Sequence, residues 1–445
     1  MDRLVGASPP IDAASRGVVN PPAVRPLYLV IGYLAFAFLW PLLLLHRKTR
    51  KGQWRRFGFY PRGFAARGGR PRIWLHGSSA GDLLALRPIA EEWRRRIPDA
   101  TIVVSALTDS GHAIASRLGD LVDAVTYQPW DLPGATRRAV RAIDPDILVL
   151  EYTEIWPNLI RAAKRHGTKV VLTNGRFDAQ KMGHYRALFS VVGNPLAEVD
   201  LLLMREEDEA ERALELGAPP GRVRVTGNSK FDALVPSDES EPEDLAAALG
   251  EGPIFFAGST HEGEEGPLLQ VFSRLREAHP SLRMVIAPRY VDRAPRLAHL
   301  AQAEGFSVGL RTRGGANADV VILDTIGELY AAYRHATLVF VGGSFTSRGG
   351  QNILEPAARG KPVLFGPNMQ NFRDSVQVLL GRGGIQVSDP DHLARTALDL
   401  LDRPGRLAEL GAMARNAVLA VGGASRRNVE EMMRLLEESE VEEAA

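Results

Sequence analysis

Short apolar runs alternate with amphipathic stretches along most of the chain after residue 72. In the first half, seven runs rich in Val, Ile and Leu show no polar alternation, which is typical of strands buried on both faces of a parallel sheet. Alternating strands and helices predict βαβ units and a doubly wound sheet. The predicted strands are residues 73–76, 101–106, 124–128, 147–151, 169–173, 200–204 and 223–226, and the predicted helices are residues 83–96, 111–118, 134–143, 157–166 and 206–216.

The alternation stops at residues 236–244, a polar, acidic and proline-flanked stretch that reads as a linker. It restarts with a second set of apolar runs. The fold class that follows is α/β, with two Rossmann-like domains facing each other across a cleft, as in GT-B glycosyltransferases. A ligand is expected at the carboxyl ends of the strands. The second set of predicted strands is residues 254–257, 284–287, 320–323, 338–341 and 362–365.

An uncharged stretch, residues 27–45, precedes both domains. A helix over this stretch rises about 28 Å, close to one hydrocarbon core. The next 27 residues, 46–72, hold ten Lys or Arg and no Asp or Glu, which is typical of a cytoplasmic flank that binds anionic lipids. We therefore expect a membrane-anchor helix. The alternatives are a buried core helix or a cleaved signal peptide, and Pro41 would allow the helix to enter one leaflet without crossing.

These patterns divide the chain into seven parts. The predicted parts are a disordered lead (1–26), a membrane anchor (27–46), a basic juxtamembrane segment (47–71), a first Rossmann-like domain (72–232), to which the resemblance given below assigns the acceptor, a linker (233–251), a second domain that binds the nucleotide (252–425), and a C-terminal helix with an acidic tail (426–445).

Composition excludes several classes of protein. The 445 residues carry 54 Lys and Arg against 53 Asp and Glu, a formal net charge of +1, whereas a protein that binds nucleic acid over its whole surface is usually more basic. The chain has no cysteine, which excludes disulfides, thiolate zinc sites, iron–sulfur clusters and cysteine nucleophiles. We expect no cofactor, no metal and no nucleic-acid partner.

Three loops of the first half contain candidate chemistry. Asp82 follows a glycine-containing turn, where its carboxylate is either a general base or a helix N-cap. Glu151 and Glu154 end a strand, which suits acid–base work or recognition of sugar hydroxyls; alternatively, Glu154 caps the next helix and Trp156 packs. Lys230 precedes the linker, where it meets an anionic donor or is simply solvated.

The second half has the features of a nucleotide site. Ser259 and Thr260 end a strand with small residues and hydroxyls, which allows close backbone approach to phosphate. Arg289 ends another strand, and its guanidinium suits phosphate or carboxylate. The glycine-rich loop of residues 342–350 is either a phosphate-binding loop, through backbone amides such as that of Gly343, or a flexible connector. After it, Asn352 and Glu355 lie three residues apart on one helix face, where Glu355 can accept hydrogen bonds from ribose.

Five segments together resemble the 3-deoxy-D-manno-octulosonic acid (Kdo) transferases of lipopolysaccharide synthesis. The segments are EIWPN (154–158), GNSKFD (227–232), AGSTH (257–261), DTIGEL (324–329) and GGSFTSRGGQNILEP (342–356). The resemblance implies a GT-B fold and a membrane-associated enzyme at the cytoplasmic face of the inner membrane. It also implies transfer of Kdo from CMP-Kdo to a lipid A precursor, with inversion at the anomeric centre.

The resemblance also implies roles for individual residues. Asp82 stands where the family has a glutamate that acts as general base, and Glu154 matches a second essential acidic position. The positions associated with the donor or its CMP are Lys230, Arg289, Ser344, Asn352 and Glu355.

The chain departs from the family pattern in four places. Asp82 replaces the family's glutamate and is shorter by one methylene. Tyr290 and Gln351 replace two histidines, and residues 174–178 (NGRFD) depart from the usual Asn-Ala-Arg. Three readings therefore remain: a Kdo transferase acting on lipid A precursor, a GT-B enzyme with another sugar or acceptor, and a catalytically weak nucleotide-binding membrane protein.

Overall fold

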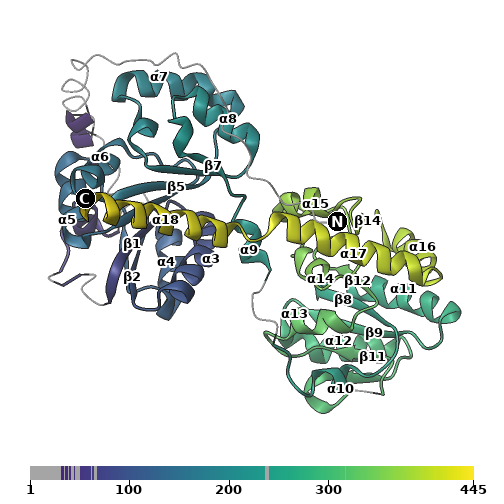
Figure 1. Ribbon diagram of the computed structural model, residues 1–445. Helices are drawn as coiled ribbons and strands as arrows, with labels where there is room; N and C mark the ends of the chain where they lie inside the picture. Colours follow the sequence, from purple (N-terminus) through teal and green to yellow (C-terminus); the bar gives the residue numbers. More distant parts are fainter. Residues whose placement is uncertain are drawn as a thin grey trace. The chain divides into compact units, whose positions relative to one another are not determined.

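The computed structural model describes residues 32–34, 36–38, 40–41, 45, 51–61, 63–64, 68–235, 240–315 and 317–444. The chain forms two compact units (Figure 1). The first comprises Met1–Ala233 together with Gly423–Ala445, and the second comprises Leu234–Gly422.

The first unit contains a seven-stranded parallel sheet in the order β3-β2-β1-β4-β5-β6-β7. In β1, Ile73 lies opposite Ile102 of β2 on one side and Ile147 of β4 on the other. The predicted parallel sheet is confirmed. Its strands are β1 (Gly69–Gly77), β2 (Ala100–Ala106), β3 (Ala124–Tyr127), β4 (Ile147–Glu151), β5 (Lys169–Gly175), β6 (Leu201–Met204) and β7 (Val223–Val225).

Helices cover both faces of this sheet, and in Figure 1 α7 and α8 lie on one side of the strands and α3 and α4 on the other. Trp74 points to the face covered by α5, α6 and α8, whereas Ile73 and Leu75 point to the face covered by α3. The helices are α2 (Gln53–Arg56), α3 (Ala80–Arg96), α4 (Asp109–Ala115), α5 (Pro133–Ile143), α6 (Pro157–Arg165), α7 (Met182–Val192), α8 (Glu207–Glu215), α9 (Lys230–Leu234) and α18 (Ala424–Ala444).

The last helix returns to the first unit. Val429 and Met432 of α18 are fully buried against Ile73 and Leu75, and α18 packs along α3. The predicted second domain, 252–425, therefore overlaps the first unit at residues 423–425. The sequence showed a C-terminal helix but not where it packs, since its apolar face is equally suited to either sheet.

Part of the predicted basic juxtamembrane segment is built into the first unit. Arg56 is fully buried, with its guanidinium 4.5 Å from the ring centre of Tyr127 and 5.2 Å from that of Trp130. Its Nη2 donates to the carbonyl of Leu107 at 2.7 Å. Burial lowers the pKa of Arg56 to about 10. This arginine is therefore a structural residue of the first unit and is not available to a lipid headgroup.

The second unit contains another seven-stranded parallel sheet, in the order β10-β11-β9-β8-β12-β13-β14. It begins before its first strand: Leu245 and Leu249 of α10 are fully buried, so this part of the predicted linker, 233–251, belongs to the second unit. The strands are β8 (Ile254–Thr260), β9 (Arg283–Pro288), β10 (Val308–Leu310), β11 (Val320–Ile322), β12 (Leu338–Val341), β13 (Val363–Phe365) and β14 (Gly384–Gln386).

Helices again cover both faces. Phe255 and Phe340 point into a core covered by α11, α12, α16 and α17, whereas Phe256 points to the other face and packs on Tyr333, with ring centres 4.9 Å apart. The prediction of a second Rossmann-like domain is confirmed. The helices are α10 (Leu245–Leu249), α11 (Glu265–Ala278), α12 (Ala294–Ala303), α13 (Leu329–Ala332), α14 (Leu354–Ala358), α15 (Arg373–Leu379), α16 (Pro390–Leu401) and α17 (Pro404–Val421).

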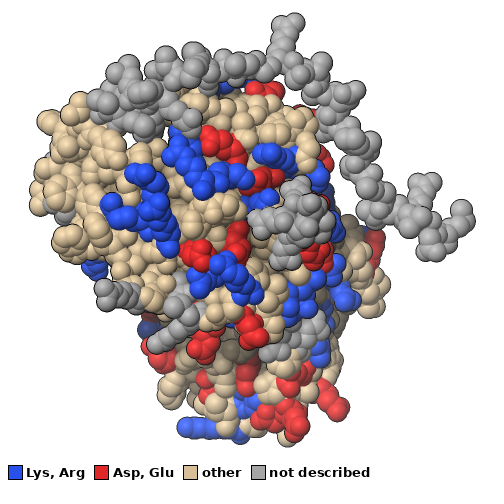
Figure 2. All heavy atoms as spheres, turned by 60° about the vertical axis from the view of Figure 1, so that its left-hand side comes forward, with Lys and Arg blue, Asp and Glu red and all other residues tan. Residues whose placement is uncertain are grey.

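The predicted lead (1–26) lies outside the described residues, as does most of the predicted anchor. Within the ranges given above, no helix combines the length and apolar character needed to span a bilayer. On the face shown in Figure 2, Lys and Arg side chains lie among Asp and Glu side chains, beside a broad area of other residues. The charges of this face are therefore mixed, in agreement with a formal net charge near zero.

Candidate functional site

Each sheet has a point where the strand order reverses, and ligands of doubly wound folds bind in the loops beside such points. In the first sheet the reversal lies between β1 and β4, so the loops that begin at Ser78 and Tyr152 flank it. In the second sheet it lies between β8 and β12, flanked by the loops that begin at His261 and Gly342. Most of the predicted site residues lie in or beside these loops, whereas Arg289 follows β9 and Lys230 follows β7 at the edge of the first sheet.

Asp82 belongs to a capping box at the start of α3. Its Oδ2 accepts the backbone N–H of Ser79 at 2.8 Å, and its own N–H donates to Ser79 Oγ at 3.5 Å. The N-cap residue is thus Ser79, and Asp82 is the third residue of the helix. Asp82 remains half-buried, and its other oxygen is outside the capping box. The cap role is therefore present and leaves one carboxylate oxygen to a second role.

Glu154 is held by two ring nitrogens. Trp156 Nε1 donates to Glu154 Oε2 at 2.8 Å, and His76 Nε2 lies 3.5 Å from the same oxygen. Burial favours a raised pKa for Glu154, but its interaction with His76 and the hydrogen bond from Trp156 outweigh burial and lower the pKa. Glu154 is therefore an anion at neutral pH. Trp156 occupies the N-cap position of α6, so Glu154 does not cap this helix.

His76 is a site residue that the sequence reasoning missed. It is fully buried near the end of β1, and its Nδ1 lies 2.9 Å from Ser105 Oγ of β2. This contact fixes the ring so that Nε2 faces Glu154. A histidine in an apolar strand was the available signal, but which loop it faces depends on β1 and β4 being neighbours.

Lys230 is the first residue of α9, in the first unit. Its backbone N–H donates to Asn228 Oδ1 at 3.0 Å. The same loop is fastened to α18, because Asp232 accepts the backbone N–H groups of Gly423 and Ser425 at 2.6 and 2.7 Å. Lys230 therefore stands on an ordered loop, whereas the other predicted donor residues all belong to the second unit.

The amides of the glycine-rich loop are bound by a residue that the sequence reasoning missed. The fully buried carboxylate of Glu264 accepts four backbone N–H groups. Its Oε2 accepts those of His261 (2.9 Å) and Gly343 (2.7 Å), and its Oε1 those of Ser344 (3.1 Å) and Phe345 (2.9 Å). This is a correction: the amides of Gly343 and Ser344, predicted to hold phosphate, hold an internal carboxylate.

Two of the predicted hydroxyls are also used internally. Ser344 Oγ donates to the carbonyl of Val341 at 2.6 Å and accepts the N–H of Gly366 at 2.8 Å. Thr260 Oγ1 donates to Glu265 at 3.2 Å. Ser344 and Thr260 are both fully buried, so their side chains order the loops and are not exposed to a ligand. Sequence spacing identified the right loops but not which atoms face outward.

Ser259 and Arg289 are the accessible residues of this edge. Ser259 has a φ of +54°, a left-handed conformation that non-glycine residues adopt rarely and often at functional sites. Arg289 follows β9 and is exposed, and its backbone N–H donates to the carbonyl of Thr260 at 2.9 Å.

Glu355 and Asn352 form a pair at the start of α14. Asn352 Nδ2 donates to Glu355 Oε1 at 2.9 Å and to the carbonyl of Leu234 at 2.5 Å. Burial raises the pKa of Glu355 to about 7, against the opposing effects of Asn352 and the positive charge of Arg289. Asn352 and Glu355 are thus paired, but Asn352 lies in the loop before α14 and the two do not share a helix face as predicted.

Tyr290 and Gln351, which stand where the family has histidines, both lie beside His261. His261 Nε2 is 3.0 Å from Gln351 Nε2, and its ring meets the ring of Tyr290 edge-on, with centres 5.8 Å apart. Burial lowers the pKa of His261, so the ring is neutral at pH 7. Gln351 and Tyr290 therefore lie in the same part of the site, next to Gly343.

A family model and the most similar curated relatives point to one family. Residues 51–233 match the family model described as 3-deoxy-D-manno-octulosonic-acid transferase (kdotransferase). A 3-deoxy-D-manno-octulosonic acid transferase of Chlamydophila psittaci is 32% identical over 385 residues, which cover 84% of this chain and 88% of the relative. The chain belongs to the Kdo transferase family. It is therefore a glycosyltransferase.

Two further comparisons extend this result. The 3-deoxy-D-manno-octulosonic acid transferase of Bordetella pertussis is also 32% identical, over 425 residues that cover 89% of this chain and 97% of the relative. Among solved structures, UDP-GlcNAc 2-epimerase from Neisseria meningitidis matches with a TM-score of 0.53 at 13% identity, covering 82% of this chain and all of that chain. This second likeness shows the two-domain α/β fold alone.

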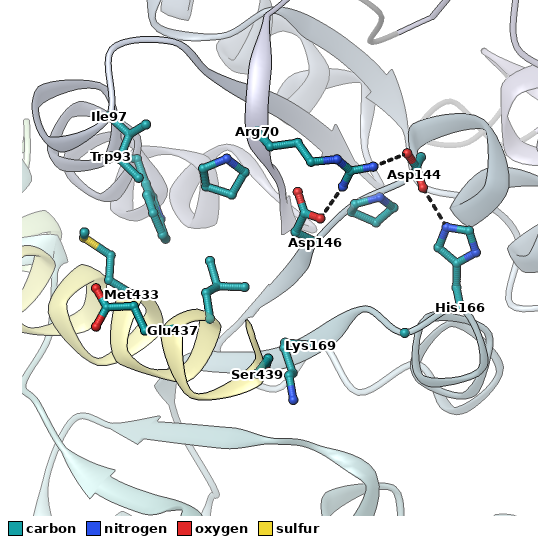
Figure 3. Close-up of a pocket in the computed structure, with 14 residues that line it drawn as sticks. Arg70, Trp93, Ile97, Asp144, Asp146, His166, Lys169, Met433, Glu437 and Ser439 are labelled. Carbon is teal, nitrogen blue, oxygen red and sulfur yellow. Dashed lines mark hydrogen bonds and ion pairs between the residues drawn. The ribbon is translucent and has the colours of Figure 1, made fainter. Parts of the chain in front are cut away.

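In this Kdo transferase family member, the first unit also has a pocket at the opposite edge of its sheet (Figure 3). The pocket has a volume of about 650 Å³ and lies between the amino ends of β1 and β5 and helices α3 and α18. Four of its ionisable side chains pair with one another: Arg70 Nη2 lies 2.7 Å from Asp144, Arg70 also binds Asp146, and His166 Nε2 lies 3.0 Å from Asp144. The pocket is separate from Asp82 and Glu154.

No group of three or more His, Asp or Glu side chains in the described ranges is arranged to bind a metal ion. In the first unit, Asp82, Glu154 and His76 lie at the carboxyl ends of the strands. In the second unit, Arg289, Asn352 and Glu355 lie in the corresponding place.

Proposed function

We propose that this protein transfers Kdo from CMP-Kdo to a lipid A precursor at the cytoplasmic face of the inner membrane, with inversion at the anomeric centre. The observation that carries the proposal is the position of Asp82 and Glu154. Both carboxylates lie in the loops beside the point where the first sheet reverses its strand order, and the chain is a member of the Kdo transferase family.

In the proposed reaction Asp82 is the general base. The acceptor hydroxyl loses its proton as it attacks the anomeric carbon, and a carboxylate within hydrogen-bond reach takes that proton. The Ser79 N–H holds one oxygen of Asp82, so the carboxylate has a fixed orientation. The other oxygen accepts the proton.

Glu154 has a different part in the proposal. Its lowered pKa keeps it ionised, and Trp156 and His76 fix its position. A fixed anion accepts hydrogen bonds from sugar hydroxyls and orients the acceptor toward Asp82. In this proposal Asp82 takes the proton, and Glu154 in the neighbouring loop orients the acceptor.

The donor is assigned to the second unit, with Lys230 of the first unit as a further cation. Arg289 is exposed at the end of β9, where its guanidinium suits the phosphate of CMP or the carboxylate of Kdo. Glu355 accepts hydrogen bonds from the ribose hydroxyls, and Asn352 holds it in place. Ser259 allows the donor to approach the backbone.

Membrane association is proposed from the segment before the first unit. Phe36 meets Trp130 and Trp40 meets Phe57, with ring centres 5.4 and 5.9 Å apart. Leu34, Phe38 and Leu45, at helical spacing, are 66%, 82% and 78% exposed. A helix with one face on the protein and an apolar face outward suits a bilayer surface containing anionic lipids.

The test is transfer by the full-length protein. CMP-Kdo and a lipid A precursor in mixed vesicles are incubated with the protein, and the mass of the lipid is measured. A gain of one or more Kdo residues is the expected result, and Asp82→Asn serves as the inactive control. Binding of CMP without transfer to any lipid in a panel would instead support the nucleotide-binding reading. Transfer to another acceptor would support the reading as a different GT-B enzyme.

A further inference from the structure

We propose that Glu151 and Asn174 are positioning residues for the transfer reaction, because through Ser229 they hold the loop that carries Lys230 against the helix that carries Asp82. This inference rests on the proposed function for its catalytic consequence. All the residues involved belong to the first unit.

Glu151 is the last residue of β4 and is fully buried. Its Oε1 accepts Asn174 Nδ2 at 2.5 Å, and its Oε2 lies 2.7 Å from Thr173 Oγ1. A buried carboxyl is costly unless its oxygens have partners, and here both oxygens are satisfied by the end of the neighbouring strand β5. Glu151 is therefore coupled to Asn174 and to no ligand-facing group directly.

Asn174 connects this carboxyl to the loop of residues 227–232. Its Nδ2 donates to Ser229 Oγ at 2.6 Å as well as to Glu151, and its Oδ1 accepts the backbone N–H of Ser229 at 2.8 Å. Its φ is +50°, a left-handed conformation in which asparagine is among the more tolerated residues. Both amide hydrogens and the amide oxygen are used, so the side chain has one orientation.

Ser229 completes the connection to α3. Its Oγ donates to the carbonyl of Ala85 at 2.8 Å, three residues after Asp82 in the same helix. Ser229, Asn174 and Glu151 are all fully buried. A buried polar network whose members are all satisfied is rigid, and loss of one member leaves the others unpaired. The network therefore fixes the backbone at Lys230 relative to the backbone at Asp82.

The network also depends on the charge of Glu151. Burial raises its pKa to about 8, and the negative charge of Asp82 adds to this rise, while Thr173, Asn174 and the positive charge of Arg205 oppose it. At pH 7 the carboxyl is therefore mostly protonated. Ionisation above about pH 8 adds a second negative charge near Asp82 in a buried site.

The experiment compares Glu151→Gln, Glu151→Ala and Asn174→Ala with the wild type in the full-length protein. Transfer is measured from pH 6.5 to 9.5, with kcat and the KM for each substrate. Because an amide reproduces the neutral carboxyl, Glu151→Gln is expected to keep a rate within about threefold of the wild type at pH 7. It is also expected to lose the fall in kcat that the wild type shows above about pH 8.

The two alanine variants are expected to lower kcat about tenfold or more, since misplacing a reacting group by about 1 Å costs on the order of a hundredfold. They should also weaken the binding of CMP-Kdo, because the loop that they release carries Lys230. Asp131→Asn is the control: Asp131 is a half-buried carboxyl of the first unit, and it accepts the N–H groups of Asn158 and Leu159. It should leave the alkaline fall in kcat as in the wild type.

A second measurement does not depend on the substrate. Amide hydrogen exchange of residues 227–232 should become faster in Asn174→Ala and stay unchanged in Glu151→Gln. Unchanged exchange in a folded Asn174→Ala would overturn the proposal, as would an alkaline fall in kcat that is equal in the wild type and Glu151→Gln. If the wild type transfers no Kdo, the proposed function fails, and hydrogen exchange still decides whether the network positions this loop.

Discussion

The carboxylate of Glu264 accepts the backbone N–H of Gly343 at 2.7 Å, across 79 residues of sequence. The contact ties the loop after β8 to the loop after β12 at the point where the second sheet reverses its order. Three more amides bind the same carboxylate. A glycine-rich loop that looks in sequence like a phosphate-binding loop therefore already binds an internal anion.

Removing the Glu264 carboxylate is expected to lower the free energy of unfolding of the second unit. Glu264→Ala leaves four buried amides without an acceptor, and each such group costs roughly 1–3 kcal/mol. We expect a loss of at least about 3 kcal/mol in the free energy of unfolding, measured by urea denaturation. Glu264→Gln should also destabilise, because each oxygen accepts two N–H groups and an amide NH₂ cannot.

The control for this experiment is Glu262→Ala, two residues away. Glu262 is exposed and pairs with Arg296 on the surface, where an ion pair contributes less than about 1 kcal/mol. Equal stability of Glu264→Ala and Glu262→Ala would show that water replaces the buried carboxylate at no cost.

The variant Asp82→Asn tests whether Asp82 serves only to cap the helix or also acts as the general base. An asparagine at this third helical position can still accept the Ser79 N–H through its Oδ1, and the lost negative charge near the helix N-terminus costs about 0.3–1 kcal/mol. We expect the thermal midpoint to fall by less than about 4 °C, because 1 kcal/mol shifts the midpoint of a domain of about 150–250 residues by roughly 2–4 °C. Turnover should fall roughly a hundredfold or more, because the proton acceptor is lost.

Asp82→Glu is the companion variant. The family's longer side chain should raise turnover if the loop has kept the family backbone, and should impair it if the loop has moved inward to suit aspartate. Turnover of Asp82→Asn equal to that of the wild type would leave Asp82 as a cap alone and direct attention to Glu154 as the base.

Arg289→Ala and Glu355→Ala are each expected to weaken the binding of CMP. Charge-assisted hydrogen bonds contribute roughly 1.5–3 kcal/mol, which corresponds to about a ten- to hundredfold loss of affinity. Isothermal titration calorimetry at pH 7 provides the measurement. Unchanged affinity in both variants would remove the second unit from the donor site.

Glu355 also predicts a pH dependence. Its pKa of about 7 means that the carboxylate that accepts ribose hydroxyls is mostly absent at pH 6 and mostly present at pH 8. Affinity for CMP should therefore rise with pH in the wild type. The phosphate of CMP itself titrates near pH 6, so Glu355→Gln is measured in parallel. The rise that remains in this variant belongs to the ligand, and an identical rise in both proteins would exclude Glu355.

The exposed aromatic residue Phe38 tests the membrane proposal. We expect Phe38→Asp and deletion of residues 1–46 to reduce binding to vesicles that contain anionic lipid, measured by flotation. Ile326→Asp is the control, because Ile326 is an equally exposed apolar residue of the second unit. We expect the basic residues after the predicted anchor to bind anionic lipid electrostatically. Because salt screens this attraction, 0.5 M NaCl should weaken the vesicle binding that remains after the deletion. Equal flotation of the deletion and the full chain would exclude an anchor.

The sequence predicted the strands and the loops that matter. Runs such as residues 147–151 and 254–257 are apolar on both faces, and an apolar run buried on both faces is a local property that the chain carries with it. Because functional loops follow the carboxyl ends of such strands, Asp82, Glu154, Arg289 and Glu355 were identified before any packing was known.

Only the tertiary structure decided which partner each of these loops has. Glu264 reaches Gly343 because β8 and β12 are neighbours, and Asn174 reaches Ser229 because β5 and the loop after β7 meet at one edge. In the same way, α18 packs on the first sheet after the chain has passed through the second unit. Periodicity along a chain specifies which face of an element is buried, but a hydrogen bond between distant loops depends on strand order, and strand order is a property of the folded sheet.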